Sequence, residues 1–284
     1  MSGGPCRDCF SGVINSGTPT GSESVIHGLP TYVAQPHGQP KGLVVIISDA
    51  FGWTFSNTRV LADKYAKTGD FLVYVPDVMK DSMVYLDKVT APSSWFSTIF
   101  LKPYYMVRAM LHFVPFLIRC RPAVAKPAVF DFFRALRSSP DTTNLKIGVA
   151  GFCWGGKFTV LLAQDAPSSR VHKAGSEAGE PHSLVDAAFT AHPSLLQVPE
   201  DITPVSVPLS IAIGDVDMAL KKSLVEQAKE ILEKKKAGDH ECIIYPGAKH
   251  GFAVRGDPDD PRQKELGEQA ETQALSWFAK WLTK

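Results

Sequence analysis

The chain of 284 residues has almost no net charge, because its 30 lysines and arginines nearly balance 29 aspartates and glutamates. Nucleic-acid-binding surfaces need a clustered excess of positive charge, so this balance argues against a nucleic-acid partner. Cysteine is also scarce, with five residues spread widely. An odd, scattered set argues against a disulfide framework and is typical of a reducing compartment. We therefore expect a cytoplasmic protein whose partner is a small molecule.

Other signals are missing as well. Residues 1–18 lack the cationic start and apolar core of a secretory signal. Cys6 and Cys9 form a C-x-x-C pair, but no further ligands follow at matching spacing, so we expect no metal site and no cofactor. The apolar segment 95–119 is interrupted by charged residues and a proline before it reaches about 20 apolar residues, so we expect no membrane span.

Apolar runs typical of strands alternate with helical patterns along the chain. This alternation predicts one α/β domain over residues 1–284, with an extended segment at 1–21 and a mostly parallel central sheet between helices. Expected strands lie near residues 24–34, 42–49, 71–76, 145–151, 186–191, 207–214 and 241–245. Expected helices lie near residues 56–68, 122–138, 156–166, 221–236 and 262–284. A short loop joins the first two strands, which predicts that they pair antiparallel and that the others are parallel.

The most informative motif is Gly151-Phe152-Cys153-Trp154-Gly155-Gly156. It follows an apolar run at 147–150 and precedes a helical pattern at 157–166, which predicts a strand, a tight turn and a helix with Cys153 at the apex. This is the layout of a nucleophile elbow, with a thiol in place of the usual serine. The helix N-terminus favours a thiolate, so Cys153 is the candidate nucleophile. An inert core thiol is the alternative.

An acid and a histidine follow in the order that this architecture requires. One strand ends in Gly214-Asp215-Val216-Asp217, and we favour Asp217 as the acid because it lies beyond the turn. Asp215 is the rival, with a role as turn residue or helix N-cap as its alternative. Another strand runs into the loop of His250, which can take the thiol proton and pass it to the leaving group. His192 ends a third strand, as a pocket-wall residue or a buried, hydrogen-bonded histidine.

A buried strand at 43–49 leads into a loop that begins Asp49-Ala50-Phe51-Gly52. In this architecture such a loop supplies one amide of the oxyanion hole, and the residue after the nucleophile supplies the other. The predicted donors are therefore the backbone N–H groups of Ala50 and Trp154.

Together these motifs resemble the dienelactone hydrolase family of α/β-hydrolases, in its fungal-type branch, from about Ser22 to the C-terminus. The resemblance rests on the elbow and on three further stretches: Ser48-Asp49-Ala50-Phe51-Gly52, Gly214-Asp215-Val216-Asp217 and Tyr245-Pro246-Gly247-Ala248-Lys249-His250-Gly251-Phe252. It implies the α/β-hydrolase fold. It also implies a triad of Cys153, His250 and Asp217 that opens esters or lactones.

The resemblance also draws attention to Asp49 and Arg255 as substrate-side residues. Family members usually carry a glutamate at the position of Asp49 that contacts the resting thiol; here the side chain is one methylene shorter, and a loop-capping carboxylate is the alternative. Members that open dienelactone have an arginine at the position of Val254, whereas this chain has Arg255. Arg255 either grips a substrate carboxylate or is a solvated cation paired with nearby aspartates, Asp257 or Asp259. We therefore do not carry the family's substrate over.

The apolar stretch within residues 84–122 predicts a helical insertion. Residues 95–119 are expected to form a cap with an aromatic wall for a cyclic substrate, with a dimer interface or a packing helix as the alternative. Arg108 either binds an acidic substrate or extends to water. The expected function is a cysteine hydrolase of small esters or lactones, while a non-catalytic binding protein and a redox-sensing thiol remain alternatives.

Overall fold

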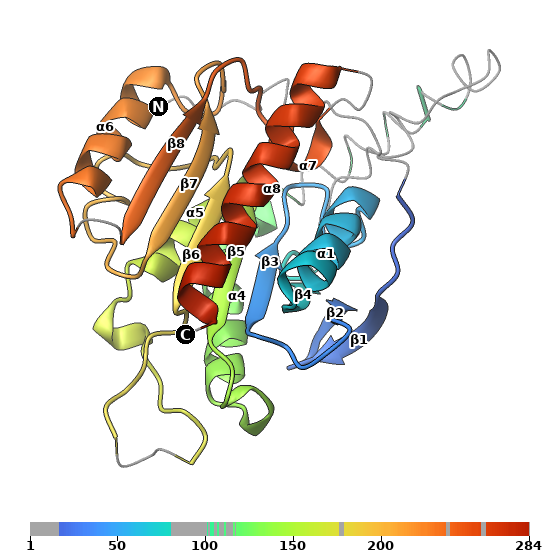
Figure 1. The fold of residues 1–284 in the computed structure, drawn as a ribbon, viewed down its shortest axis with the longest axis vertical. Helices are drawn as coiled ribbons and strands as arrows, with labels where there is room; N and C mark the ends of the chain where they lie inside the picture. The colour runs from blue at the N-terminus through green and yellow to red at the C-terminus, as the bar shows by residue number, and fades with distance from the viewer. Residues whose placement is uncertain are drawn as a thin grey trace.

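An eight-stranded mixed sheet forms the centre of the computed structural model in Figure 1. The structure describes residues 17–80, 118–175, 179–236, 239–256 and 260–283, with scattered positions between 101 and 116. The strands lie in the order β1-β2-β4-β3-β5-β6-β7-β8. They span Ser22–Ile26 (β1), Leu29–Ala34 (β2), Leu43–Ile47 (β3), Leu72–Pro76 (β4), Ile147–Phe152 (β5), Ala187–Ala191 (β6), Leu209–Gly214 (β7) and His240–Tyr245 (β8).

From β4 to β8 every neighbouring pair of strands is parallel, which confirms the predicted parallel sheet. The middle strands are buried along their whole length because helices cover both faces of the sheet. Strand β3 reads LVVII, and all five side chains are buried. The core therefore holds this part of the sheet fixed beneath the loops that follow it.

The prediction for the first strands was wrong in two respects. Residues 24–34 do not form one strand, because His27 and Gly28 both have positive φ, 47° and 81°, and turn the chain into a two-residue hairpin between β1 and β2. Strand β2 then pairs antiparallel with β4 rather than with β3. Strand β4 lies between them, since the crossover after β3 brings the chain back on that side.

The helices form a layer on each face of the sheet. Helices α1 (Ser56–Gly69) and α8 (Pro261–Leu282) contact each other on one face, where α8 crosses in front of the central strands in Figure 1. The crossover helices α4 (Pro122–Arg137), α5 (Trp154–Ala163) and α6 (Lys222–Glu233) belong to the other face, as right-handed connections require. These five match the predicted helices within three residues at each end. The short helices η3 (Pro140–Thr142), η4 (Pro167–Ser169) and α7 (Phe252–Arg255) were not predicted.

Two predicted segments lie largely outside the described residues. These are the N-terminal segment 1–21, described only from residue 17, and the insertion at 84–122. The choice between a cap, a dimer interface and a packing helix therefore stays a prediction, and Arg108 also lies outside the described residues. Within the described residues, no helix has the length and hydropathy to cross a membrane.

The parallel strands bring all the predicted catalytic groups to one edge of the sheet. The carboxyl ends of β3, β5, β6, β7 and β8 are adjacent in the sheet, and each runs into a loop that carries a candidate residue. Asp49, Cys153, His192, Asp217 and His250 follow these strands in that order. This is the edge at which open parallel sheets bind their ligands.

Candidate active site

Cys153 lies at the turn between β5 and α5 with φ 51° and ψ −111°. A positive φ is strained for a residue with a side chain, and such strain persists only where the surroundings hold it. The following helix packs unusually close to the sheet, because a Cβ on Gly155 would lie 2.1 Å from the carbonyl oxygen of Ile47. Cys153 is 3% exposed, so the elbow holds its thiol in a nearly closed site.

His250 is held by a buried carboxylate. Its Nδ1 lies 2.9 Å and 3.0 Å from the two oxygens of Asp217, and both side chains are fully buried. Asp217 Oδ1 also accepts the N–H of Ala219 at 2.8 Å, which fixes the carboxylate. Of the two candidate acids it is therefore Asp217 that lies against the histidine. Asp215 instead accepts the N–H of Gly247 at 2.8 Å and braces the loop that carries His250.

That loop reaches Asp217 because β7 ends in Gly214. A Cβ at this position would lie 1.8 Å from the carbonyl oxygen of Ala248, so only glycine permits the approach. The loop after β8 can then cross over the end of β7. Gly214 has no catalytic group, but its lack of a side chain lets the loop of His250 come close to Asp217.

The imidazole of His250 favours its charged form. Burial lowers the pKa of His250, but the negative charge of Cys153 and hydrogen bonds with Asp217 and Cys153 outweigh it and raise the pKa to about 10. Nε2 has no well-aligned hydrogen-bond partner among the described residues, and such loose contacts are common before a substrate binds. The arrangement therefore favours a protonated imidazole beside Cys153.

Asp49 and Arg255 form a buried ion pair beside this site. Arg255 Nε lies 3.0 Å from Asp49 Oδ2, and the two side chains are 1% and 0% exposed. Asp49 Oδ1 accepts the N–H of Phe51 at 3.0 Å, and the Arg255 guanidinium lies over the Phe51 ring at 4.7 Å. Arg255 is therefore not a solvated loop cation. Asp49 accepts a hydrogen bond within its own loop, which agrees with the loop-capping alternative for this residue.

The charged form of Asp49 is disfavoured by burial, although Arg255 is its partner. The pKa of Asp49 is raised to about 6, mainly by burial, with the negative charge of Cys153 adding to the rise and Arg255 opposing it. The influence of Cys153 shows that the carboxylate and the thiol share one electrostatic environment. Asp49, Arg255, Cys153 and His250 therefore belong to one coupled cluster.

His192 is fully buried beside His250. Its ring is 5.1 Å from the His250 ring at an interplanar angle of 72°, an edge-to-face arrangement. Neither ring nitrogen has a hydrogen-bond partner among the described residues, so the buried, hydrogen-bonded alternative does not hold. Burial, together with the charges of His250 and Arg255, lowers the pKa of His192 well below its usual value. His192 is therefore a neutral wall behind His250.

The two predicted oxyanion donors lie on separate elements, and their role stays a prediction. Trp154 is the first residue of α5, where a backbone N–H has no partner within the helix. Ala50 follows Asp49 in the loop after β3. The Trp154 side chain is also anchored, because its Nε1 donates to the carbonyl of Cys120 at 2.6 Å and its ring lies 4.5 Å from Phe158. This bond joins the residue after the nucleophile to the start of α4.

Cys120 and Cys242 are buried as well. Burial raises the pKa of Cys120 to about 12, and likewise that of Cys242 to about 12. Both are free thiols that stay protonated at neutral pH. In the part of the chain that the structure describes, no group of His, Cys, Asp and Glu side chains is arranged to hold a metal ion.

Ser194 is a site residue that the sequence reasoning missed. Its hydroxyl lies 3.8 Å from Cys153 Sγ, and its backbone N–H donates to the Cys153 carbonyl at 2.9 Å. The available signal was a hydroxyl residue just after a strand that ends at the catalytic edge.

Exposed apolar side chains lie next to site residues in sequence: Leu195 beside Ser194, and Val216 and Met218 on either side of Asp217.

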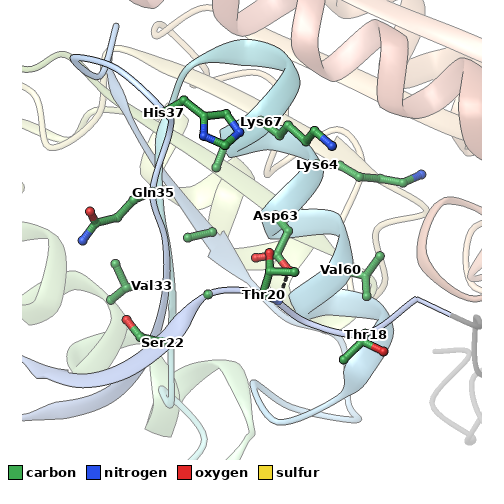
Figure 2. A pocket seen from close by; sticks show the side chains of 13 residues that line it. Thr18, Thr20, Ser22, Val33, Gln35, His37, Val60, Asp63, Lys64 and Lys67 are labelled. Carbon is green, nitrogen blue, oxygen red and sulfur yellow. Dashed lines mark hydrogen bonds between the residues drawn. The ribbon is translucent and has the colours of Figure 1, made fainter.

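The hollow in Figure 2 lies elsewhere, between the N-terminal stretch, β2 and α1. It has a volume of about 560 Å³ and is lined by residues such as Thr18, Gln35 and Lys67. Asp63 in its wall is already engaged by the N–H of Thr20 and the hydroxyl of Tyr32, both at 2.7 Å. None of the candidate site residues lines it.

Comparison with known proteins agrees with this arrangement. The sequence model of the dienelactone hydrolase family matches residues 29–282. The hydrolase tropI of Talaromyces stipitatus is 27% identical, covering 96% of this chain and 95% of its own length. The hydrolase pyvD of Aspergillus violaceofuscus is 25% identical, covering 99% and 98%. A solved Klebsiella pneumoniae structure described as a dienelactone hydrolase has a TM-score of 0.62 at 20% identity, covering 92% of this chain and 99% of its own. The predicted α/β-hydrolase fold is thereby confirmed.

Proposed function

Because this chain belongs to the dienelactone hydrolase family and is an ester or lactone hydrolase, we propose that Cys153 is its nucleophile, with His250 as base and Asp217 as the group that orients it. One observation carries the proposal. Asp217 holds the His250 ring through Nδ1, and Cys153 lies near enough to raise the pKa of His250, while the three residues follow three different strands. This is the relation of orienting acid, base and nucleophile that acyl transfer needs.

In the proposed first step, the Cys153 thiolate attacks the carbonyl carbon of the ester. The negative charge that develops on the carbonyl oxygen is stabilised by the N–H groups of Ala50 and Trp154. One such donor is typically worth about 2.7–4 kcal/mol in the transition state. The His250 imidazolium then protonates the departing alcohol oxygen, which leaves an acyl-thioester on Cys153 and a neutral imidazole.

In the second step, His250 takes a proton from a water molecule, and the resulting hydroxide attacks the thioester carbonyl. The thiolate leaves, the acid is released, and the imidazole is again protonated. Asp217 holds the ring through Nδ1 in both steps, so that Nε2 stays directed at the reacting atoms. Fully buried His192 packs against the same ring and leaves it little room to turn.

We propose an uncharged small ester or lactone as the substrate. Arg255 is 1% exposed and paired with Asp49, so an anionic substrate would have to compete with that carboxylate for the guanidinium. An uncharged acyl group needs no such exchange. The exposed side chains of Leu195, Val216 and Met218 suit a cyclic or aromatic substrate. A neutral aryl ester should therefore be hydrolysed faster than the same ester carrying a carboxylate.

The test is hydrolysis of a small neutral aryl ester by the variant Cys153→Ala. We expect at least about a 10³-fold loss of kcat, because no acyl-enzyme can form. The matched control is Cys242→Ala, which removes another buried thiol from β8, away from the site, and should keep near wild-type activity. If Cys153→Ala is folded and hydrolyses the ester at the wild-type rate, the assignment is wrong. The cytoplasmic location expected from the cysteine usage would keep such a thiol reduced.

A further inference from the structure

We propose that Ser194 is a further active-site residue, whose hydroxyl is a resting hydrogen-bond partner of Cys153 Sγ and stabilises the thiolate. The inference rests on the proposed role of Cys153 as nucleophile. It concerns how the thiol is kept reactive between turnovers, to which Ser194 adds a neutral hydrogen-bond partner beside His250.

The stretch from Ala191 to Ser194 contacts Cys153 at three separate points. The N–H of Cys153 donates to the carbonyl of Ala191 at 3.3 Å, and the N–H of Ser194 donates to the carbonyl of Cys153 at 2.9 Å. The third contact is between Sγ and the Ser194 hydroxyl, at 3.8 Å. Both backbone groups and the side chain of the strained residue are therefore held by one short segment.

The path of this segment brings the hydroxyl to the sulfur. His192 has φ 39° and turns the chain sharply at the end of β6. Pro193 then packs on the start of α5, where a Cβ on Gly156 would lie 2.7 Å from the Pro193 Cβ. The turn leaves Ser194 half-buried next to the nearly closed thiol, while the His192 ring lies against His250. One turn thus contacts both the nucleophile and the base.

A hydroxyl suits both states of the nucleophile. A serine oxygen can accept a hydrogen bond from the S–H of the thiol, and its O–H can donate to the thiolate. Hydrogen bonds to a charged partner are stronger than those between neutral groups, so the contact favours the thiolate. His250 supplies positive charge to the same sulfur. The sulfur is therefore stabilised by an imidazolium and by a neutral donor.

The experiment measures the rate of iodoacetamide alkylation at Cys153 against pH, with the modified peptide quantified by mass spectrometry so that other cysteines do not contribute. For Ser194→Ala we expect the midpoint of the profile to move up by about one pH unit, because a donor to the thiolate is lost. Below that midpoint the alkylation rate and kcat/KM for a neutral aryl ester should both fall about tenfold. At higher pH both should return toward wild-type values.

Two further variants make the result specific. Ser194→Thr keeps the hydroxyl and should keep the midpoint near that of the wild type. Ser206→Ala removes an exposed serine whose hydroxyl bonds to the carbonyl of Gln164, and it should change neither profile. The backbone N–H of residue 194 still reaches the Cys153 carbonyl in every variant, so the turn should keep its fold.

The proposal is overturned if Ser194→Ala leaves the alkylation midpoint unchanged, or if Ser194→Thr shifts it as far as the alanine does. These outcomes are separate from failure of the triad assignment. Ester turnover that survives in Cys153→Ala would refute the proposed function, whereas an unchanged midpoint in Ser194→Ala, with an inactive Cys153→Ala, would refute the serine's role alone.

Discussion

Replacing Arg255 with methionine should destabilise the protein strongly. The substitution keeps an unbranched apolar side chain but leaves Asp49 buried without its cation. Breaking a buried pair by removing one partner typically costs about 3–5 kcal/mol, because a charge remains in a poorly solvated place. That is a large share of the roughly 5–15 kcal/mol by which most domains are stable. At about 2–4 °C per kcal/mol, the midpoint of thermal unfolding should fall by roughly 6–20 °C.

The matched control is Lys41→Met, which breaks the ion pair between Lys41 and Asp70. Its distance of 2.8 Å is similar, but the side chains are 55% and 42% exposed. Exposed pairs contribute at most about 1 kcal/mol, so this variant should unfold close to the wild type. Adding Asp49→Asn to Arg255→Met should recover part of the loss, because the buried charge is then gone. Equal unfolding midpoints for Arg255→Met and Lys41→Met would refute this reasoning.

The pH dependence of stability tests the same pair. Since burial raises the folded-state pKa of Asp49 from 3.8 to about 6, the stability that its protonation gives is full below 3.8 and is lost as the pH rises through about 6. In Arg255→Met the pKa of Asp49 should rise further, so the loss should continue to higher pH. Asp49→Asn should remove this component altogether, which chemical denaturation at several pH values would reveal.

Four further substitutions test other contacts. Asp217→Asn should lower kcat by about 10²–10⁴-fold in steady-state assays, while Asp215→Asn stays near the wild type; the opposite order would identify the other acid. Trp154→Phe keeps an aromatic ring but loses the hydrogen bond to the Cys120 carbonyl. The free energy of unfolding, measured with denaturant, should fall by about 1–3 kcal/mol, and an unchanged unfolding midpoint would contradict this. Gly214→Ala should cost about 3 kcal/mol and much of the turnover, because its Cβ would overlap the Ala248 carbonyl. Wild-type stability and rate would contradict this.

The features that could be predicted from the sequence have local signals. Cys153 has glycines on both sides, between a strand and a helix. Asp217 and His250 each follow an apolar run that ends in a glycine-bearing loop. Parallel strands deliver such loops to one edge, so the neighbourhood of the three side chains follows from strand order. The helices were predicted well for the same reason, since their periodicity is local.

The remaining features depend on contacts that no local pattern records. The pairing of Arg255 with Asp49 joins a short helix late in the chain to the loop after β3, and the sequence around Arg255 favoured nearby aspartates equally. The hairpin at His27 was missed because a histidine takes the positive φ that asparagine or aspartate usually takes before glycine in such turns. Ser194 has no spacing signal at all, because its approach to the thiol depends on the turn at His192.

The bond from the Trp154 indole to the Cys120 carbonyl constrains any redesign of residues 84–119. Grafting a foreign segment into residues 84–119 would leave the elbow intact in sequence. The graft must still place the main-chain oxygen of residue 120 within hydrogen-bond distance of the indole. Otherwise Trp154, which carries a proposed oxyanion amide, loses this hydrogen bond. Libraries that vary this segment should therefore keep the junction at Cys120, Arg121 and Pro122 fixed.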